Sequence, residues 1–133
     1  MHVKNLGTER ASFMSPTNSG IQKGLHVTLH SDFNVLPLDP MMIMWTAMNR
    51  TTRTGAVLGA GERLTAMQAL KAITIESAYE YMEEKTKGSI EPGKLADFVI
   101  LSGNPLNASG DAIRDIKVVE TVKEGKSVYK RPA

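Results

Sequence analysis

The stretch from Gly88 to Leu101 constrains the fold of this chain more than any other part of it. Residues 91–94, Glu-Pro-Gly-Lys, predict a tight turn, because proline fixes φ at the first central position and glycine supplies the positive φ at the second. The short run 96–101 is mostly apolar and rich in β-formers, which is typical of a strand covered on both faces. The pattern before this stretch is helical, and the pattern after it is that of strands and turns.

A second strand is expected at Leu25–His30, after a short helix expected over Ser15–Lys23. A helix, a turn and a strand in this order resemble one repeat of an α/β fold, in which functional residues gather at the carboxyl ends of strands. His30, Ser31 and Asp32 are therefore the first candidate site residues. The alternative is that Ser31 and Asp32 only form a turn or cap a helix.

Three further helical segments are predicted from capping and periodicity. Asp39 and Pro40 are typical of an N-cap and a first helical residue, so a helix is expected over Met41–Asn49. Thr65 and Gln68 form the pattern of a capping box at the start of the next helix. The pattern remains helical over 75–84 after a bend, whereas Met1–Ser19 is expected to be irregular.

The polar loop 50–55 contains two cations, Arg50 and Arg53. They are either solvated surface residues or the rim of a substrate pocket that receives an anionic group. After the strand at 96–101, two β-rich runs at 116–122 and 126–129 are joined by a short link containing glycine, which predicts a hairpin.

Composition excludes several classes of protein. A chain of 133 residues is expected to form one domain, and its net charge of +2 is scattered, which gives no case for binding nucleic acid. It contains no cysteine, so disulfides and thiolate metal sites are excluded. No run approaches the ~20 apolar residues of a membrane helix, and no signal peptide is recognisable. We expect a soluble, cytoplasmic protein with no membrane partner.

The motif Gly-Ser-Ile-Glu-Pro-Gly-Lys-Leu-Ala-Asp-Phe-Val-Ile-Leu at 88–101 closely resembles the C-terminal signature of the amidohydrolase superfamily of metal-dependent hydrolases. Other segments resemble its amidohydrolase-3 branch. They lie in the expected order at 6–11, 24–32, 39–40, 49–53, 62–70 and 121–126.

The resemblance implies an α/β fold in which a (β/α)8 barrel carries a smaller β-sandwich built from both chain ends. Residues 1–87 would be the last strand and helices of this TIM-type barrel, and residues 88–133 the C-terminal strands of the composite sandwich. Asp32 would follow the last barrel strand, where the family's aspartate binds a divalent metal, commonly zinc, and accepts a proton from the attacking water. His30 and Ser31 would flank this site.

The implied activity is the metal-dependent hydrolysis of carbon–nitrogen bonds other than peptide bonds, on a small amide-type substrate. The family's other metal ligands, a His-x-His pair among them, have no counterpart in this chain, and a zinc site needs at least three protein ligands. We therefore expect a C-terminal fragment that is inactive alone. The alternative is a non-catalytic structural or self-association module, because an incomplete barrel exposes strand edges and apolar surface. Because of this exposed surface, we expect the isolated chain to be a homo-oligomer, rearranged or poorly soluble.

Overall fold

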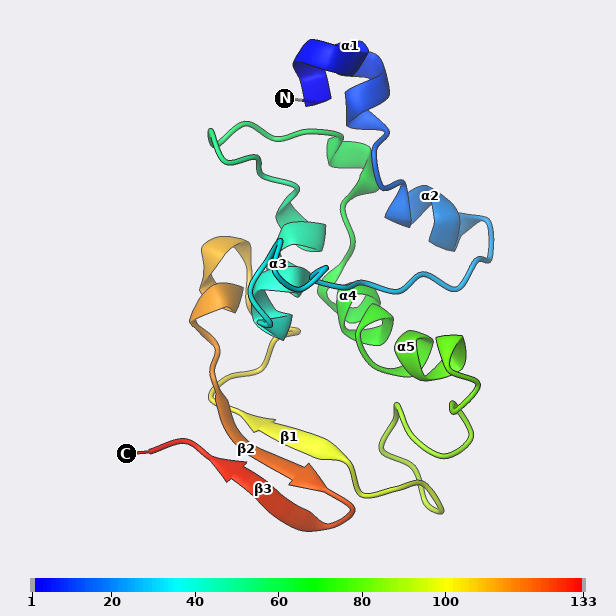
Figure 1. Ribbon diagram of the computed structural model, residues 1–133, viewed down its shortest axis with the longest axis vertical. Coiled ribbons are helices and arrows are strands. Elements are labelled where there is room, and N and C mark those ends of the chain that lie inside the picture. Colours follow the sequence, from blue (N-terminus) through cyan, green and yellow to red (C-terminus); the bar gives the residue numbers. More distant parts are fainter. Residues whose placement is uncertain (1, 133) are drawn as a thin grey trace.

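The computed structural model describes residues 2–132 and places helices before a small sheet (Figure 1). The helices are α1 (His2–Ser12), α2 (Thr17–Gln22), α3 (Pro40–Asn49), α4 (Ala66–Ala72) and α5 (Ile75–Glu80), with short 3₁₀ helices η1 (Ala60–Glu62) and η2 (Gly110–Asp115). The strands are β1 (Phe98–Leu101), β2 (Val118–Lys123) and β3 (Lys126–Lys130).

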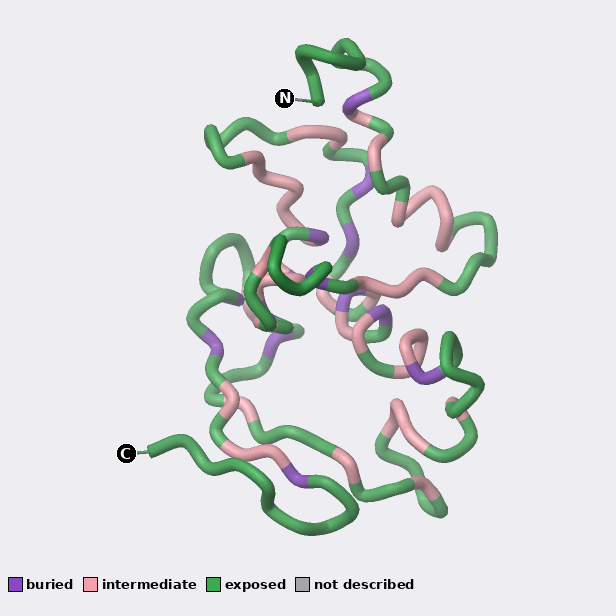
Figure 2. The backbone as a smooth tube through the Cα atoms, in the orientation of Figure 1, coloured by how far each residue is buried: buried purple, intermediate pink, exposed green. Residues whose placement is uncertain are grey.

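The N-terminal segment is more regular than predicted. Residues expected to be irregular form α1, which is kinked at Gly7, where φ is 74° and ψ is 163°. Because Gly7 has non-helical dihedral angles, α1 consists of two short helical segments joined by a kink. The helix extends away from the rest of the molecule, and Ala11 is its buried residue (Figures 1 and 2). Met1 lies outside the described residues.

Two predicted helix starts are confirmed in detail. The Asp39 carboxylate accepts hydrogen bonds from the backbone N–H groups of Met41 and Met42, at 3.0 and 3.2 Å. Both halves of the capping box between Thr65 and Gln68 are formed at the start of α4. These bonds satisfy backbone donors that have no partner inside the helix, so both starts are determined locally.

Helix α5 is shorter than predicted, because it ends at Glu80 rather than at Glu84. The next turn contains Met82 in the left-handed region, with φ of 59°, and a helix cannot continue through that conformation.

The strand predicted at Leu25–His30 is not formed, and a (β/α)8 barrel is not evident in residues 2–132. The Leu29 N–H donates to the carbonyl of Ala72 at 3.3 Å, which joins this segment to the end of α4 rather than to another strand. A barrel strand exists only between hydrogen-bonded neighbours, and the described residues contain none beside this segment. The observed fold is a mixed α/β arrangement.

The sheet is antiparallel with the order β1-β2-β3. The predicted hairpin is confirmed: its two linking residues, Glu124 and Gly125, have φ of 49° and 76°, as two-residue hairpin turns require. The prediction that the strand ending at Leu101 is covered on both faces is wrong, because Phe98, Val99 and Ile100 are 40–49% exposed. Within the described residues, no second layer packs over both faces of the sheet (Figure 1).

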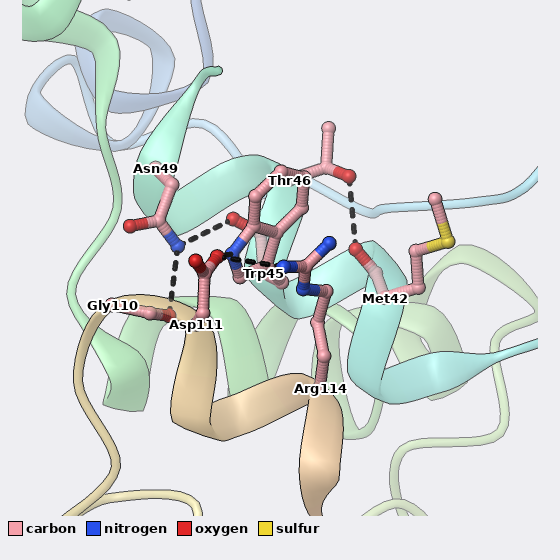
Figure 3. Close-up of polar contacts among 7 residues, drawn as sticks. All are labelled: Met42, Trp45, Thr46, Asn49, Gly110, Asp111 and Arg114. Carbon is pink, nitrogen blue, oxygen red and sulfur yellow. Dashed lines mark hydrogen bonds and ion pairs between the residues drawn. The ribbon is translucent and has the colours of Figure 1, made fainter. Parts of the chain in front are cut away.

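The core lies where η2 packs on α3, and Met44 and Ile113 are its largest fully buried side chains. Polar contacts reinforce this packing at its edge (Figure 3). The indole N–H of Trp45 donates to Asp111 Oδ1 at 2.8 Å, and the Arg114 guanidinium lies 4.3 Å from the centre of the Trp45 ring. Since η2 connects β1 to β2, this contact ties the sheet to the helices.

Candidate functional site

Asp32 lies in an exposed turn directly after the segment 25–30. Its backbone is in the left-handed region, with φ of 49°, which aspartate adopts more readily than most residues. The Asp32 N–H donates to His30 Nδ1 at 3.1 Å, while Ser31 between them is buried. Two of the three predicted residues therefore lie at the surface and are linked to each other, and the third packs inward.

A hollow of about 380 Å³ lies beside this turn, and we name it the α3 hollow. Its walls come from residues 14–17, from 28–30, from Leu36, from α3 and from 50–58. His30 and Arg50 both line it. Arg53, the other predicted cation, lies in an exposed turn and does not line the hollow.

The guanidinium of Arg50 holds three backbone segments together. Its Nε donates to the Leu58 carbonyl at 2.8 Å, its Nη1 to the Ser15 carbonyl at 3.1 Å and its Nη2 to the Met14 carbonyl at 2.7 Å. Charge-assisted bonds of this kind are stronger than neutral ones, so they fix the hollow's rim. A role for Arg50 in binding substrate stays a prediction, as it does for the other candidate residues.

Glu62 is a buried acid near this rim that the sequence analysis did not single out. It is 7% exposed, and its carboxylate accepts hydrogen bonds from the Ser19 hydroxyl and from the Ser19 N–H, the latter at 2.9 Å. These two bonds, and to a smaller extent the positive charge of Arg50, lower the pKa of Glu62 below its usual 4.5. No local pattern marks this residue, because its partners lie more than forty positions away in the sequence.

The described residues do not complete a metal site. Among residues 2–132, no group of three or more His, Asp or Glu side chains could hold a metal ion. Asp32 and His30 are linked through the Asp32 backbone N–H, and a zinc site needs at least three protein ligands. No helix in the same range is long and apolar enough to cross a membrane.

Comparison with known families identifies the family of this chain. The sequence profile described as "Amidohydrolase family" matches residues 1–129, which is nearly the whole chain. The chain belongs to the amidohydrolase family. This confirms the resemblance inferred from residues 88–101 and from the segments before them.

Individual relatives and solved structures are similar to this chain. The N-substituted formamide deformylase of Arthrobacter pascens is 35% identical over 116 residues, which cover 87% of this chain and 21% of the relative. The crystal structure of an amidohydrolase from Thermotoga maritima superposes with a TM-score of 0.60 and 30% identity, over 84% of this chain and 24% of that one. Guanine deaminase of E. coli, at 21% identity and a TM-score of 0.64, shares the fold over 86% of this chain.

The chain spans about a fifth of the deformylase's length and about a quarter of the Thermotoga enzyme's. The activity, substrate and metal of a whole amidohydrolase are therefore proposals for this chain.

Proposed function

We propose that this chain is the C-terminal part of a metal-dependent hydrolase that acts on carbon–nitrogen bonds other than peptide bonds. The family match over residues 1–129 carries this proposal. Asp32 is its catalytic residue and contributes one carboxylate to a site for zinc or another divalent metal. The other ligands must come from polypeptide beyond the described residues, so the chain alone is inactive.

The position of Asp32 supports this role. Its turn is exposed, and its backbone N–H is bonded to His30 at the wall of a hollow large enough for a small molecule. His30 and Ser31 would orient the substrate or the Asp32 turn.

A chimera tests the proposal. This chain replaces the matching C-terminal segment of the Arthrobacter pascens deformylase, and hydrolysis of an N-substituted formamide is measured. We expect the chimera to be active. Asp32→Asn should lower its kcat about 10²- to 10⁴-fold, which is the usual contribution of a positioned proton-transfer group. Asp115→Asn, an exposed acid on η2, is the matched control. A folded chimera whose rate is unaffected by Asp32→Asn would refute the proposal.

The second candidate is a non-catalytic module that associates with itself. It is favoured by an apolar groove of about 630 Å³ between β1, α4, α5 and the loop after α5. Hydrolysis by the chimera and light scattering of the purified chain separate the two candidates. A homo-oligomer together with a folded chimera that does not hydrolyse its substrate supports this module, whereas a monomer counts against it.

A further inference from the structure

We propose that Glu62 is a positioning residue for the turn that contains Asp32. Its carboxylate holds α2 on η1, and α2 carries the segment 25–30 that leads into Asp32. This inference deepens the proposed function and rests on it only for the role of Asp32. The link from Glu62 to the turn is argued from contacts among the described residues.

The first turn of α2 is joined to η1 by side-chain hydrogen bonds. The Glu62 carboxylate accepts from the Ser19 hydroxyl and, at 2.9 Å, from the Ser19 N–H. The Thr17 hydroxyl donates to the Glu62 carbonyl at 3.1 Å, and the Asn18 side-chain amide donates to the Gly61 carbonyl at 2.9 Å. The bonds to the carboxylate are charge-assisted, so they are the strongest of this set.

These bonds give α2 its orientation. Ile21 of the same helix packs against the core cluster, but apolar packing is not directional. Hydrogen bonds require a narrow range of distance and angle. Glu62 is only 7% exposed, so water has little access to compete for its bonds with Ser19. The carboxylate therefore determines how α2 lies on the core.

The segment 25–30 follows α2 closely. The Leu25 N–H donates to the Gly20 carbonyl at 3.0 Å, which holds the start of the segment on the helix. A Cβ added at Gly20 would lie 3.1 Å from Val27 Cγ2, so the segment passes α2 where only glycine leaves enough room. Close-packed atoms transmit displacement, so a shift of α2 moves residues 25–27 with it.

The far end of the segment is attached to a different element. The Leu29 N–H donates to the Ala72 carbonyl of α4 at 3.3 Å, and Leu29 packs against the core cluster. The segment therefore runs from α2 to α4, and Asp32 comes three residues after Leu29 (Figure 1). The position of the Asp32 turn depends on both attachments, and Glu62 controls the one at α2.

Hydrogen exchange of the full chain tests the inference with two amides. In Glu62→Ala, the Leu29 amide should exchange at least about tenfold faster, because α2 loses two bonds to a charged group and the segment shifts away from α4. The Leu25 amide should change by less than about twofold, because its bond to Gly20 moves with α2. Equal acceleration of both amides would indicate unfolding of α2 and would overturn the inference, as would an unchanged Leu29 amide.

Matched variants separate positioning from a general loss of stability. Glu62→Gln keeps an oxygen that accepts from Ser19, so it should restore part of the protection of Leu29. Glu120→Ala on β2 removes another partly buried acid, which is paired with Lys130, and should leave Leu29 unchanged. Equal effects of Glu62→Gln and Glu62→Ala would overturn the assignment, and so would faster Leu29 exchange in Glu120→Ala.

Gly20→Ala tests the same link from the other side and leaves Glu62 in place. The added Cβ is closer to Val27 than ordinary carbon contacts, so it should displace the segment. We expect the backbone amide signals of Val27, Leu29 and Asp32 to shift while those of the β2–β3 hairpin stay unchanged. Unshifted signals over 27–32 would overturn the inference. Hydrolysis is not measured in these experiments, so an inactive chimera would defeat the proposed function while leaving this result intact.

Discussion

The contact between η2 and α3 is predicted to hold the sheet on the helices, and Ile113→Ala tests it most directly. Ile113 is 0% exposed and belongs to the same buried cluster as Met44. The substitution removes three carbon groups, which contribute about 0.8 kcal/mol each by transfer, or about 2.4 kcal/mol together. The cavity left behind adds to this loss, although the flexible side chain of Met44 can fill part of it. We expect a loss of about 3 kcal/mol in the free energy of unfolding.

The assay is urea unfolding followed by tryptophan fluorescence. Trp45 is the single tryptophan of the chain and contacts η2 through Asp111, so its emission reports on the same interface. Ile90→Ala is the matched control, because Ile90 is 90% exposed and should change stability by no more than about 0.5 kcal/mol. A loss below about 1 kcal/mol for Ile113→Ala, or equal losses for both variants, would refute the reasoning.

Three further predictions concern single contacts. Since the hydroxyl and N–H of Ser19 lower the pKa of Glu62, the ionised Glu62 stabilises the fold above the unfolded pKa of 4.5, and this stabilisation is lost as the pH falls through the folded pKa. Glu62→Gln should therefore make Tm depend less on pH in that acidic range. An unchanged dependence of Tm on pH would contradict this. Asp39→Ala should lower the free energy of unfolding, measured in urea, by about 1 kcal/mol, because two N–H groups of α3 lose their cap. An unchanged free energy of unfolding would show that the cap is dispensable. Gly88→Ala should lower Tm, since φ is +88° and an added Cβ would lie 2.6 Å from the Ala78 Cβ; an unchanged Tm would count against this crowding.

Local patterns were sufficient wherever an element's first or last hydrogen bonds are made by its own neighbours in the sequence. The Asp39 cap, the box between Thr65 and Gln68 and the turn at Glu124-Gly125 each close within a few residues. Such features predicted the starts of α3 and α4 and the β2–β3 hairpin. The same reasoning missed α1, whose two short helical segments meet at the non-helical Gly7.

The surroundings of the candidate site depend on distant partners and were less predictable. Strand-end reasoning selected His30 and Asp32, which the structure joins by a hydrogen bond. It could not foresee that Arg50 donates to carbonyls of Met14 and Ser15, thirty-five or more positions earlier. The burial of Glu62 has the same origin, because Ser19 reaches it from another element.

The unformed strand at 25–30 and the incomplete metal site have one physical explanation. A barrel strand requires parallel neighbours, and in barrel enzymes the functional side chains sit at the carboxyl ends of those same neighbours. Residues 2–132 contain no such neighbours, so the backbone of 25–30 has no sheet to join and, if Asp32 binds the metal as proposed, its other ligands are missing as well. We therefore expect that a polypeptide able to pair with residues 25–30 also completes the site around Asp32. In the chimera described above, ordering of these amides in hydrogen exchange should accompany activity, and an active chimera with 25–30 still unprotected would contradict this link.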